Sequence, residues 1–296
     1  MVDGGTMVEP GKAIRLADID PSWNGAVHGI DIQEEQSQAR LQELLEQKRG
    51  LLAEAQDKLY ASDRHALLVI FQGLAGADID AAIRHMMTGV NPQGCQAFNF
   101  ARPSSEDLDH NFLWRYSLAL PERGRIGIFN HSYYDEVVYP KVKPGVLDRQ
   151  RLTVGGDPQA FWEARYQDIN NLERHLAVNN IVVLKFFLHI SKAEQRQRFL
   201  NRTYEPQQRW RFSVAELEER DQWDQYLEAY EQAINATSTA DAPWYILPAD
   251  HAWAASLLAA EILTEAILDR GVDYPKVTEE GRADLLAARQ QLENES

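Results

Sequence analysis

A short loop in the first half of the chain has the arrangement of a phosphate-binding turn. An apolar run, Ala66–Gln72, leads into Gly73 and Gly76 and then into a segment typical of a helix start. Such turns bind phosphate with backbone N–H groups, the positive end of the helix dipole and a lysine side chain. Here Ile79 stands at the lysine position, and the acidic Asp78 precedes it. The frame of the loop is therefore present without its central cation.

Polar residues also follow a second apolar segment, Arg125–Asn130. The polar stretch runs from Asn130 to Glu136 and includes His131 and Asp135. Carboxylate and amide oxygens at the end of a strand suit Mg²⁺ or its water shell. The same residues suit a helix start, because caps and acidic side chains are favourable at the N-terminal end of a helix dipole. From the residues alone, both interpretations stay open.

Five arginines follow a third apolar segment, Ile181–Ile190. They are Arg196, Arg198, Arg202, Arg209 and Arg211. A solvated helix face is a common explanation of such a cluster. Arginines that overhang the carboxyl edge of a sheet form a lid instead, and their guanidinium groups bind phosphate bidentately. We therefore expect a helical lid at about 192–220, in which Trp210 either stacks on a base or only packs.

A parallel sheet is needed to bring these segments together. Continuous apolar runs predict buried strands at Ala66–Gln72, Cys95–Phe100, Arg125–Asn130, Ile181–Ile190 and Trp244–Pro248. The helical segments between them require right-handed crossovers and helices on both faces of the sheet. Ligands bind at the carboxyl ends of such strands, so the loop, the polar stretch and the arginines should converge.

Several further segments have a predicted conformation. Helical spacing of apolar residues predicts a long amphipathic helix over Ile32–Ala61 and a second helix over Ile79–Thr88. Ser104 followed by Asp107 is close to a capping box, which marks another helix start. The proline and glycine content of Val137–Pro158 is typical of a surface connection.

The composition indicates one globular domain with extensions. The chain has 296 residues and a net charge of −15, which argues against a protein that coats nucleic acid. No apolar run approaches the roughly 20 residues that span a bilayer. The single Cys95 and the absence of a secretion signal favour a cytoplasmic location. We expect an N-terminal arm at 1–31, a single domain at 32–280 and a polar tail at 281–296.

Five motifs together resemble the polyphosphate kinase 2 family. The similarity covers about three quarters of the chain, from about Lys48 to Pro275, with the order and spacing of the motifs kept. The motifs are Gly89-Val90-Asn91-Pro92-Gln93-Gly94, Phe112-Leu113-Trp114-Arg115, Arg125-Ile126-Gly127-Ile128-Phe129-Asn130, Phe186-Phe187-Leu188-His189-Ile190-Ser191-Lys192 and Asp241-Ala242-Pro243-Trp244-Tyr245. Five ordered motifs are far more specific than one short match.

The resemblance implies a fold, an activity and an assembly. The fold would be α/β: a three-layer P-loop kinase-like fold with a central parallel sheet, a helical lid and a long N-terminal helix. The activity would be Mg²⁺-dependent phosphate transfer between inorganic polyphosphate and nucleotides, AMP/ADP or GMP/GDP. The assembly would be a homodimer or homotetramer. The resemblance implies neither a nucleic acid nor a membrane as partner.

The chain departs from the family pattern inside the phosphate loop. Family members have Gly-x-Asp-x-Ala-Gly-Lys-Asp-Gly there. Gly73 and Asp80 are retained, whereas the aspartate becomes Ala75, a glycine becomes Asp78 and the lysine becomes Ile79. The last glycine of the pattern becomes an alanine as well. These changes remove the direct cation of the loop and add a negative charge.

Other departures lie at the strand end and in the lid. His131 replaces an arginine between Asn130 and Ser132, and Ser117 stands where the family usually has histidine. In the lid, the family's Pro-x-Lys-x-Trp-Lys is matched by Pro206, Gln208, Trp210 and Arg211. The resemblance then implies these site residues. Asp80, Asn130 and Glu136 would be catalytic, with Asp80 as a weak metal ligand, and Gly73, Gly76, Arg84, Arg198, Arg202, Arg209 and Arg211 would contact phosphate or nucleotide.

Three hypotheses follow for function. In the first, the chain keeps the fold but is catalytically impaired, because phosphoryl transfer depends on cancelling negative charge at the transferring group. In the second, the chain is an active phosphotransferase with an altered site, in which His131 stands in for the arginine. In the third, it is a non-catalytic partner of an active paralogue that binds polyphosphate or nucleotide.

Overall fold

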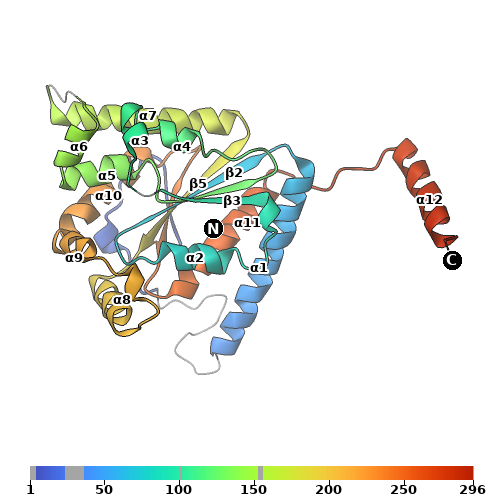
Figure 1. Ribbon diagram of the computed structural model, residues 1–296, viewed down its shortest axis with the longest axis horizontal. Coiled ribbons are helices and arrows are strands. Elements are labelled where there is room, and N and C mark those ends of the chain that lie inside the picture. Colours follow the sequence, from blue (N-terminus) through green and yellow to red (C-terminus); the bar gives the residue numbers. More distant parts are fainter. Residues whose placement is uncertain (1–4, 24–36, 101, 153–155, 296) are drawn as a thin grey trace.

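A six-stranded sheet forms the centre of the computed structural model (Figure 1). The structure describes residues 5–23, 37–100, 102–152 and 156–295. The strands, in the order β1-β6-β5-β2-β4-β3 across the sheet, are β1 (Thr6–Val8), β6 (Trp244–Pro248), β5 (Ile181–His189), β2 (Ala66–Gly73), β4 (Ile126–Asn130) and β3 (Cys95–Asn99). All neighbouring strands are parallel except β1, which pairs antiparallel with β6. The predicted central parallel sheet is confirmed.

Helices cover both faces of this sheet and its carboxyl edge. They are α1 (Ser37–Ser62), α2 (Ile79–Met86), α3 (Ser105–Asp109), α4 (Trp114–Ser117), α5 (Asp135–Val142), α6 (Gly145–Arg149), α7 (Pro158–Val178), α8 (Lys192–Tyr204), α9 (Val214–Asp221), α10 (Trp223–Thr237), α11 (Ala252–Leu268) and α12 (Glu279–Glu293), with 3₁₀ turns η1 (Leu16–Asp18), η2 (Pro92–Gly94) and η3 (Arg209–Arg211). Helices α1, α2 and α11 pack together on one face, and α5, α7 and α10 on the other. The predicted three layers are therefore confirmed.

Burial explains why the strands are continuous apolar runs. Every residue of β2 is buried, and so are the last seven residues of β5 beside it. A parallel strand with helices on both sides has no solvent-facing side, so apolar residues need not alternate with polar ones.

The helix start expected at Ser104 is present at the beginning of α3. The Ser104 side chain accepts from the Asp107 N–H, and the Asp107 side chain accepts from the Ser104 N–H.

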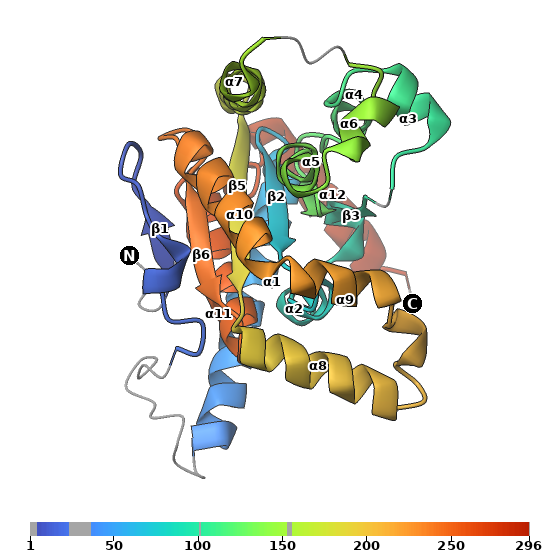
Figure 2. The ribbon, with the colours of Figure 1, turned by 90° about the vertical axis from the view of Figure 1, so that its left-hand side faces the viewer.

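The lid segment folds as helices at the carboxyl edge of the sheet. Helix α8 begins directly after β5, and its N-terminus is capped by the Ser191 hydroxyl, which accepts from the Glu194 N–H. The η3 turn connects α8 to α9. Helix α9 begins with a second capping box, whose N-cap residue is Ser213. Figure 2 shows α8 and α9 beyond the ends of the strands, on the same side as the start of α2.

Two regions differ from the expectations. The N-terminal arm contains the strand β1, which is too short for a periodic pattern to reveal it. The segment expected as a surface connection over Val137–Pro158 contains most of α5 and all of α6. Its prolines are accommodated, since Pro140 lies inside α5 and Pro144 directly precedes α6. The start predicted for the long helix, at Ile32, lies outside the described residues, and the described helix begins at Ser37.

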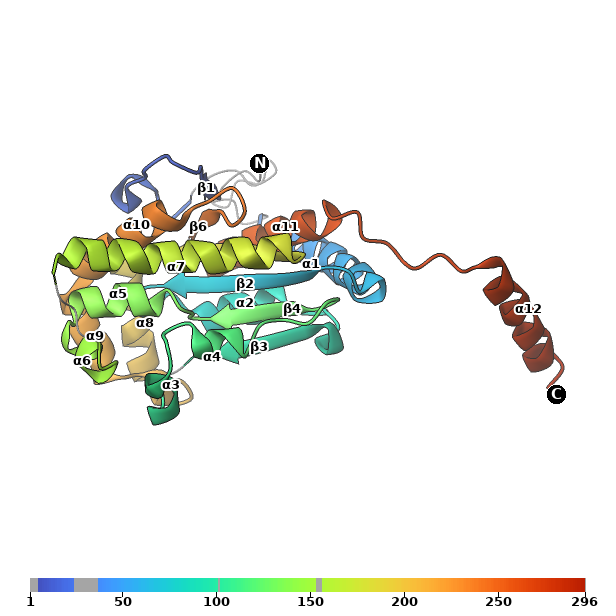
Figure 3. The ribbon, with the colours of Figure 1, turned by 90° about the horizontal axis from the view of Figure 1, so that it is seen from above.

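The C-terminal segment separates from the body. Figure 3 shows an extended connection after α11 that carries α12 away from the sheet and its helices. No residue of α12 is buried, and Leu285, Leu286 and Leu292 are exposed. The polar tail predicted at 281–296 is thus mostly helical in its described part.

An ion pair lies fully buried at the centre of the fold. Lys185, in the middle of β5, donates to Glu173 of α7 over 2.6 Å, and neither side chain has solvent exposure. Lys185 also donates to the Tyr134 hydroxyl and to the Thr237 carbonyl. Tyr133 and Tyr134 both donate to the second carboxylate oxygen of Glu173. Both charges are therefore paired and hydrogen-bonded, as burial requires.

Candidate functional site

The phosphate loop connects β2 to α2 by a tight turn with two glycines. A β-carbon on Gly73 would lie 2.8 Å from the Ala77 side chain, and one on Gly76 would lie 3.0 Å from Phe199. Gly76 also has a φ of +85°, a conformation that residues with side chains rarely adopt. The backbone geometry of the predicted loop is thus present, and helix α8 packs directly against it.

The residue at the lysine position turns toward the core. Ile79 is only 6% exposed and belongs to the hydrophobic core, together with Ala77 and Ala82. An aliphatic side chain in this position offers no charge to a phosphate. Ala75, where the family has an acidic residue, likewise has no polar side-chain atom. The loop therefore contributes only its backbone N–H groups and the helix dipole.

The added acidic residue of the loop is paired with the lid. The Asp78 carboxylate accepts from Arg202 of α8 over 2.5 Å, and the Arg198 Nε lies 3.9 Å from its other oxygen. On its opposite side, Arg202 donates to Glu216 of α9 over 3.0 Å. The positive charge of Arg202 is thus already held between two carboxylates of the chain, and these carboxylates raise the pKa of its guanidinium despite the opposing effect of burial.

Arg198 binds the backbone of the loop. Its Nη1 donates to the carbonyls of Gly76 and Ala77, its Nη2 to those of Ala249 and Asp250, and its Nε to Glu194. These contacts use all five of its N–H groups. In this structure Arg198 therefore fastens the loop to the segment after β6, and a phosphate could reach its N–H groups only by displacing these carbonyls.

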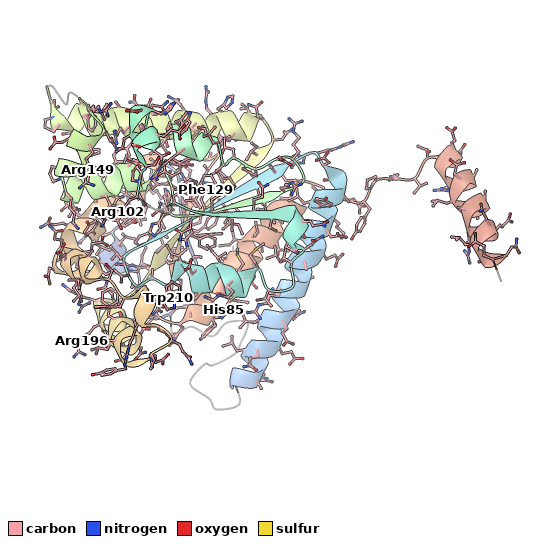
Figure 4. The ribbon with its side chains drawn as sticks, in the orientation of Figure 1. His85, Arg102, Phe129, Arg149, Arg196 and Trp210 are labelled. Carbon is pink, nitrogen blue, oxygen red and sulfur yellow. The ribbon has the colours of Figure 1, made fainter. Side chains whose placement is uncertain are left out.

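The remaining arginines of the predicted site point elsewhere. Arg84 lies exposed in the last turn of α2, at the opposite end from the helix N-terminus. Arg209 donates to the carbonyls of Thr203 and Tyr204, and the Arg211 guanidinium lies 5.0 Å from the Trp210 ring. Trp210 is 77% exposed and stands at the lid in Figure 4. The structure thus gathers Arg198 and Arg202 at the loop and leaves these three outside it.

The end of β4 meets the start of α2, as expected from the parallel sheet. Asn130, directly after Phe129 (labelled in Figure 4), donates to Asp80 over 2.6 Å. His131 adopts a left-handed conformation with a φ of 62°, and its Nδ1 lies 3.4 Å from the Asp135 carboxylate. Burial lowers the pKa of His131, but the charges of Asp135, Glu219 and Asp80 outweigh it and raise the pKa. A protonated His131 is consequently favoured at this strand end.

The raised pKa of His131 predicts a pH-dependent contribution to stability. Such a group stabilises the fold below its unfolded pKa of about 6.5, and the contribution disappears as pH rises through the higher folded pKa. We expect His131→Gln to lower the free energy of unfolding at pH about 5.5 and much less at pH about 8.5. Urea titration at both pH values measures this, with the exposed His175→Gln as control. A stability loss that is equal at both pH values would contradict it.

Glu136 belongs to a different group of side chains. It is buried and accepts from Arg115, Tyr116 and Gln150, and its backbone carbonyl accepts from Arg165. Burial raises the pKa of this carboxyl, although Arg115 opposes the shift. Because its oxygens are bound within this group, Glu136 acts in the structure as an anchor for Arg115 and Gln150, separate from the Asp80–Asn130 pair.

A cationic cavity of about 550 Å³ opens beside Glu136. Four basic side chains line it, Arg102, Arg115, Lys143 and Arg149, together with the three carboxylates of Asp135, Glu136 and Glu219. Phe100 and Leu108 add apolar surface, and His131 also lines the cavity. In the view of Figure 4, Arg102 and Arg149 lie at the upper left and Arg196 lies below them. The size and charge suit a ligand that carries a phosphate group.

Sequence reasoning missed three of these four cations. Arg115 falls within a motif of the resemblance, but nothing in the local pattern identifies Arg102, Lys143 or Arg149 as cavity residues. Lys143 and Arg149 come from the segment that was expected to be a surface connection. Lys143 directly follows α5, and Arg149 is the last residue of α6.

A metal ion would find few protein ligands at this site. Within 5–23, 37–100, 102–152 and 156–295, no group of three His, Cys, Asp or Glu side chains is placed to hold one. Asp80 is a single exposed carboxylate whose Oδ1 already accepts from Asn130. The residues therefore do not form a dedicated Mg²⁺ site of their own.

None of the helices within 5–23, 37–100, 102–152 and 156–295 combines the length and apolar character needed to cross a bilayer.

Comparisons with known proteins place this geometry in a family. The model of the polyphosphate kinase 2 family matches residues 33–275. An ADP-polyphosphate phosphotransferase of Rhodopseudomonas palustris is 47% identical over 87% of this chain and 89% of that protein. An AMP/ADP-polyphosphate phosphotransferase of Meiothermus ruber is 38% identical over 91% of this chain and 94% of that protein. The crystal structure of a polyphosphate kinase 2 from Arthrobacter aurescens superimposes with a TM-score of 0.82 at 31% identity, covering 95% of this chain and 99% of that one.

These matches agree with the sheet, the loop and the lid described above. The family match covers the long helix, the whole central sheet except its edge strand β1, and the lid helices. The chain belongs to the polyphosphate kinase 2 family.

Proposed function

We propose that this chain is a polyphosphate:nucleotide phosphotransferase by descent whose own phosphate transfer is catalytically impaired. One observation carries the proposal: the phosphate loop offers the core residue Ile79 in place of a cation, and the carboxylate of Asp78 points to the lid arginine Arg202. The names of its relatives indicate inorganic polyphosphate and AMP or ADP as substrates, with GMP and GDP as further acceptors to test.

The magnitude of the electrostatic loss supports impairment. Phosphoryl transfer relies on positioning and on stabilising the charge of the transferring group. Two opposite unit charges about 4 Å apart interact by about 4 kcal/mol at an effective dielectric of about 20. The loop lacks this attraction and adds a repulsion from Asp78. Since about 1.4 kcal/mol corresponds to a tenfold change in rate, the combined loss amounts to several powers of ten.

The remaining polar residues can still hold an anionic substrate. The loop N–H groups and the dipole of α2 would orient a phosphate, beside Asp80 in the first turn of α2 and Asn130 at the end of β4. Mg²⁺ would be supplied on the phosphates of the substrate, where it neutralises charge when bound. Homodimeric or homotetrameric assembly in the cytoplasm is proposed from the resemblance alone.

A coupled assay tests the proposal. The unmodified chain is incubated with long-chain polyphosphate, Mg²⁺ and AMP, ADP, GMP or GDP, and nucleotide products are measured. Turnover near 1 s⁻¹, roughly the low end of ordinary enzymes, would refute impairment. In that case, loss of activity on Arg202→Ala would identify an altered but working site.

A second candidate function is nucleotide binding without turnover, as a partner of an active paralogue. The observation that favours it is the cationic cavity, which persists beside the altered loop with Arg102, Arg115, Lys143 and Arg149 on its walls. Four cations against the three carboxylates of Asp135, Glu136 and Glu219 leave an excess of positive charge, which favours a phosphate-bearing ligand even where the loop cannot activate it.

Removing one cavity cation should weaken nucleotide binding. We expect Arg149→Ala to raise the Kd for ADP about tenfold, because a lost charge-assisted contact costs about 1.4 kcal/mol or more. Isothermal titration calorimetry measures the change. The matched control is Arg196→Ala, an exposed arginine of α8 that does not line the cavity. Equal Kd values for the two variants would contradict a nucleotide site in this cavity.

A further inference from the structure

The side chain of Asp78 is used in an unusual way for its position. Asp78 is the N-cap of α2 and has a left-handed φ of 55°. An aspartate at an N-cap commonly accepts from a backbone N–H of its own helix. Here the side chain makes no such cap bond, and its carboxylate is directed to Arg202 instead. The loop thus presents an anion to the lid.

Arg202 connects this anion to the outer lid. Its side chain is only 9% exposed and donates to Asp78 through Nη2 and to Glu216 through Nη1. Glu216 is in turn fixed by the capping box that begins α9, since its second oxygen accepts from the Ser213 N–H. One guanidinium therefore links the phosphate loop, the C-terminal half of α8 and the start of α9.

The first half of α8 is held by other contacts. Gln195 donates to the Ala75 carbonyl over 2.6 Å, and Arg198 donates to the Gly76 and Ala77 carbonyls. These contacts do not involve Asp78's carboxylate as a hydrogen-bond partner. Asp78 also lies 3.9 Å from the Arg198 Nε, but the hydrogen bonds of Gln195 and Arg198 to the loop carbonyls remain when its charge is removed. Beyond Arg202, the outer lid is held by the Asp78–Arg202 pair and by Arg220, which donates to the Lys192 carbonyl and to Gln195.

We propose that Asp78 is a built-in substitute for a phosphate anion, which holds the outer lid closed and excludes polyphosphate from Arg202. This proposal rests on the proposed function only because it names polyphosphate as the excluded ligand. A bound polyanion would have to displace the Asp78 carboxylate to reach this guanidinium. The lid is therefore closed by the chain itself in the absence of substrate, and Asp78 is an autoinhibitory contact.

The test removes the charge of Asp78 and keeps its shape. In Asp78→Asn, we expect hydrogen exchange to accelerate at least tenfold at 203–220 and to stay unchanged at 192–198. We also expect inorganic tripolyphosphate to bind at least tenfold tighter by calorimetry. Glu218→Gln, which neutralises an exposed residue of α9, is the matched control. Arg202→Ala should accelerate the same exchange, and combining it with Asp78→Asn should add nothing further, as for two residues of one contact.

Each outcome bears on the proposal. Unchanged exchange at 203–220 in Asp78→Asn would overturn it, and so would unchanged tripolyphosphate affinity. If Asp78→Asn does not fold, Asp78→Gly removes the same charge and suits the left-handed φ of this position, so it gives the same test. An unmodified chain that transfers phosphate, together with a faster-exchanging Asp78→Asn lid, would refute impaired catalysis and retain the closed lid. An inactive chain in which Asp78→Asn leaves hydrogen exchange of the lid unchanged would refute the closed lid and retain impaired catalysis.

Discussion

Ala75→Asp, Asp78→Gly and Ile79→Lys, introduced together, should raise polyphosphate-dependent nucleotide phosphorylation by at least about 100-fold, or about 2.7 kcal/mol in the barrier. The triple variant returns the family pattern at three of the four altered loop positions. It adds a cation and an acidic group and removes a charge that repels phosphate. The same coupled assay measures the gain, with the unmodified chain as reference.

The three changes depend on one another. A lysine at position 79 would keep its aliphatic stem in the apolar surroundings of the isoleucine and extend its ammonium group toward the loop. With Asp78 still present, that ammonium would pair with the neighbouring carboxylate. Ile79→Lys alone should therefore give much less than the triple variant, and Ile79→Leu, a control that keeps the volume, should give nothing. A triple variant that folds but stays as slow as the parent would show that other parts of the site are lost.

Lys185→Met should destabilise the fold by about 3–5 kcal/mol, because it leaves Glu173 as an unpaired charge in the interior. Both side chains are fully buried, and the pair receives further hydrogen bonds from Tyr133 and Tyr134. Desolvation without a partner is far more costly for a charge than for a neutral group. Thermal unfolding should then occur roughly 10 °C lower.

Urea denaturation measures this loss directly. Lys276→Met, which changes an exposed lysine after α11, is the matched control and should stay within about 0.5 kcal/mol of the parent. Replacing both partners, Lys185→Met with Glu173→Leu, should recover much of the stability, since no unpaired charge remains. A loss below about 1 kcal/mol for Lys185→Met alone would contradict a buried, paired charge at this place.

The sheet could be predicted because its strands are buried on both sides. The run from Ala66 to Gln72 has one conformation compatible with its length and apolar character, and β2 matches it with one residue added. The strand β1 was not predictable, because three residues give no period and its pairing with β6 is a long-range contact. Helix α5 was not expected because a proline inside a helix, such as Pro140, usually interrupts it, and α6 is too short, at five residues, to show a helical period.

The sequence predicts that the site residues converge at one edge of the sheet, but it does not predict which side chains bind one another. Parallel strands end at one edge, so the contact of Asp80 with Asn130 follows from the topology. Which partner each arginine selects depends on side-chain packing that no spacing reveals. Arg198 donates to four backbone carbonyls and to Glu194, whereas Arg202 donates to the carboxylates of Asp78 and Glu216. Glu136 is oriented by Arg115 and Gln150, which are distant from it in the sequence.

The central claim is that the chain keeps the fold of the family but lacks the loop cation needed to transfer phosphate, because Ile79 stands at the lysine position. A ³¹P NMR time course of the unmodified chain with long-chain polyphosphate, Mg²⁺ and ADP tests this most directly, with the triple loop variant as the positive control. The account predicts that the β-phosphate signal of ATP grows only with the variant. ATP formed by the unmodified chain at a rate near 1 s⁻¹ per site, roughly that of an ordinary enzyme, would contradict it.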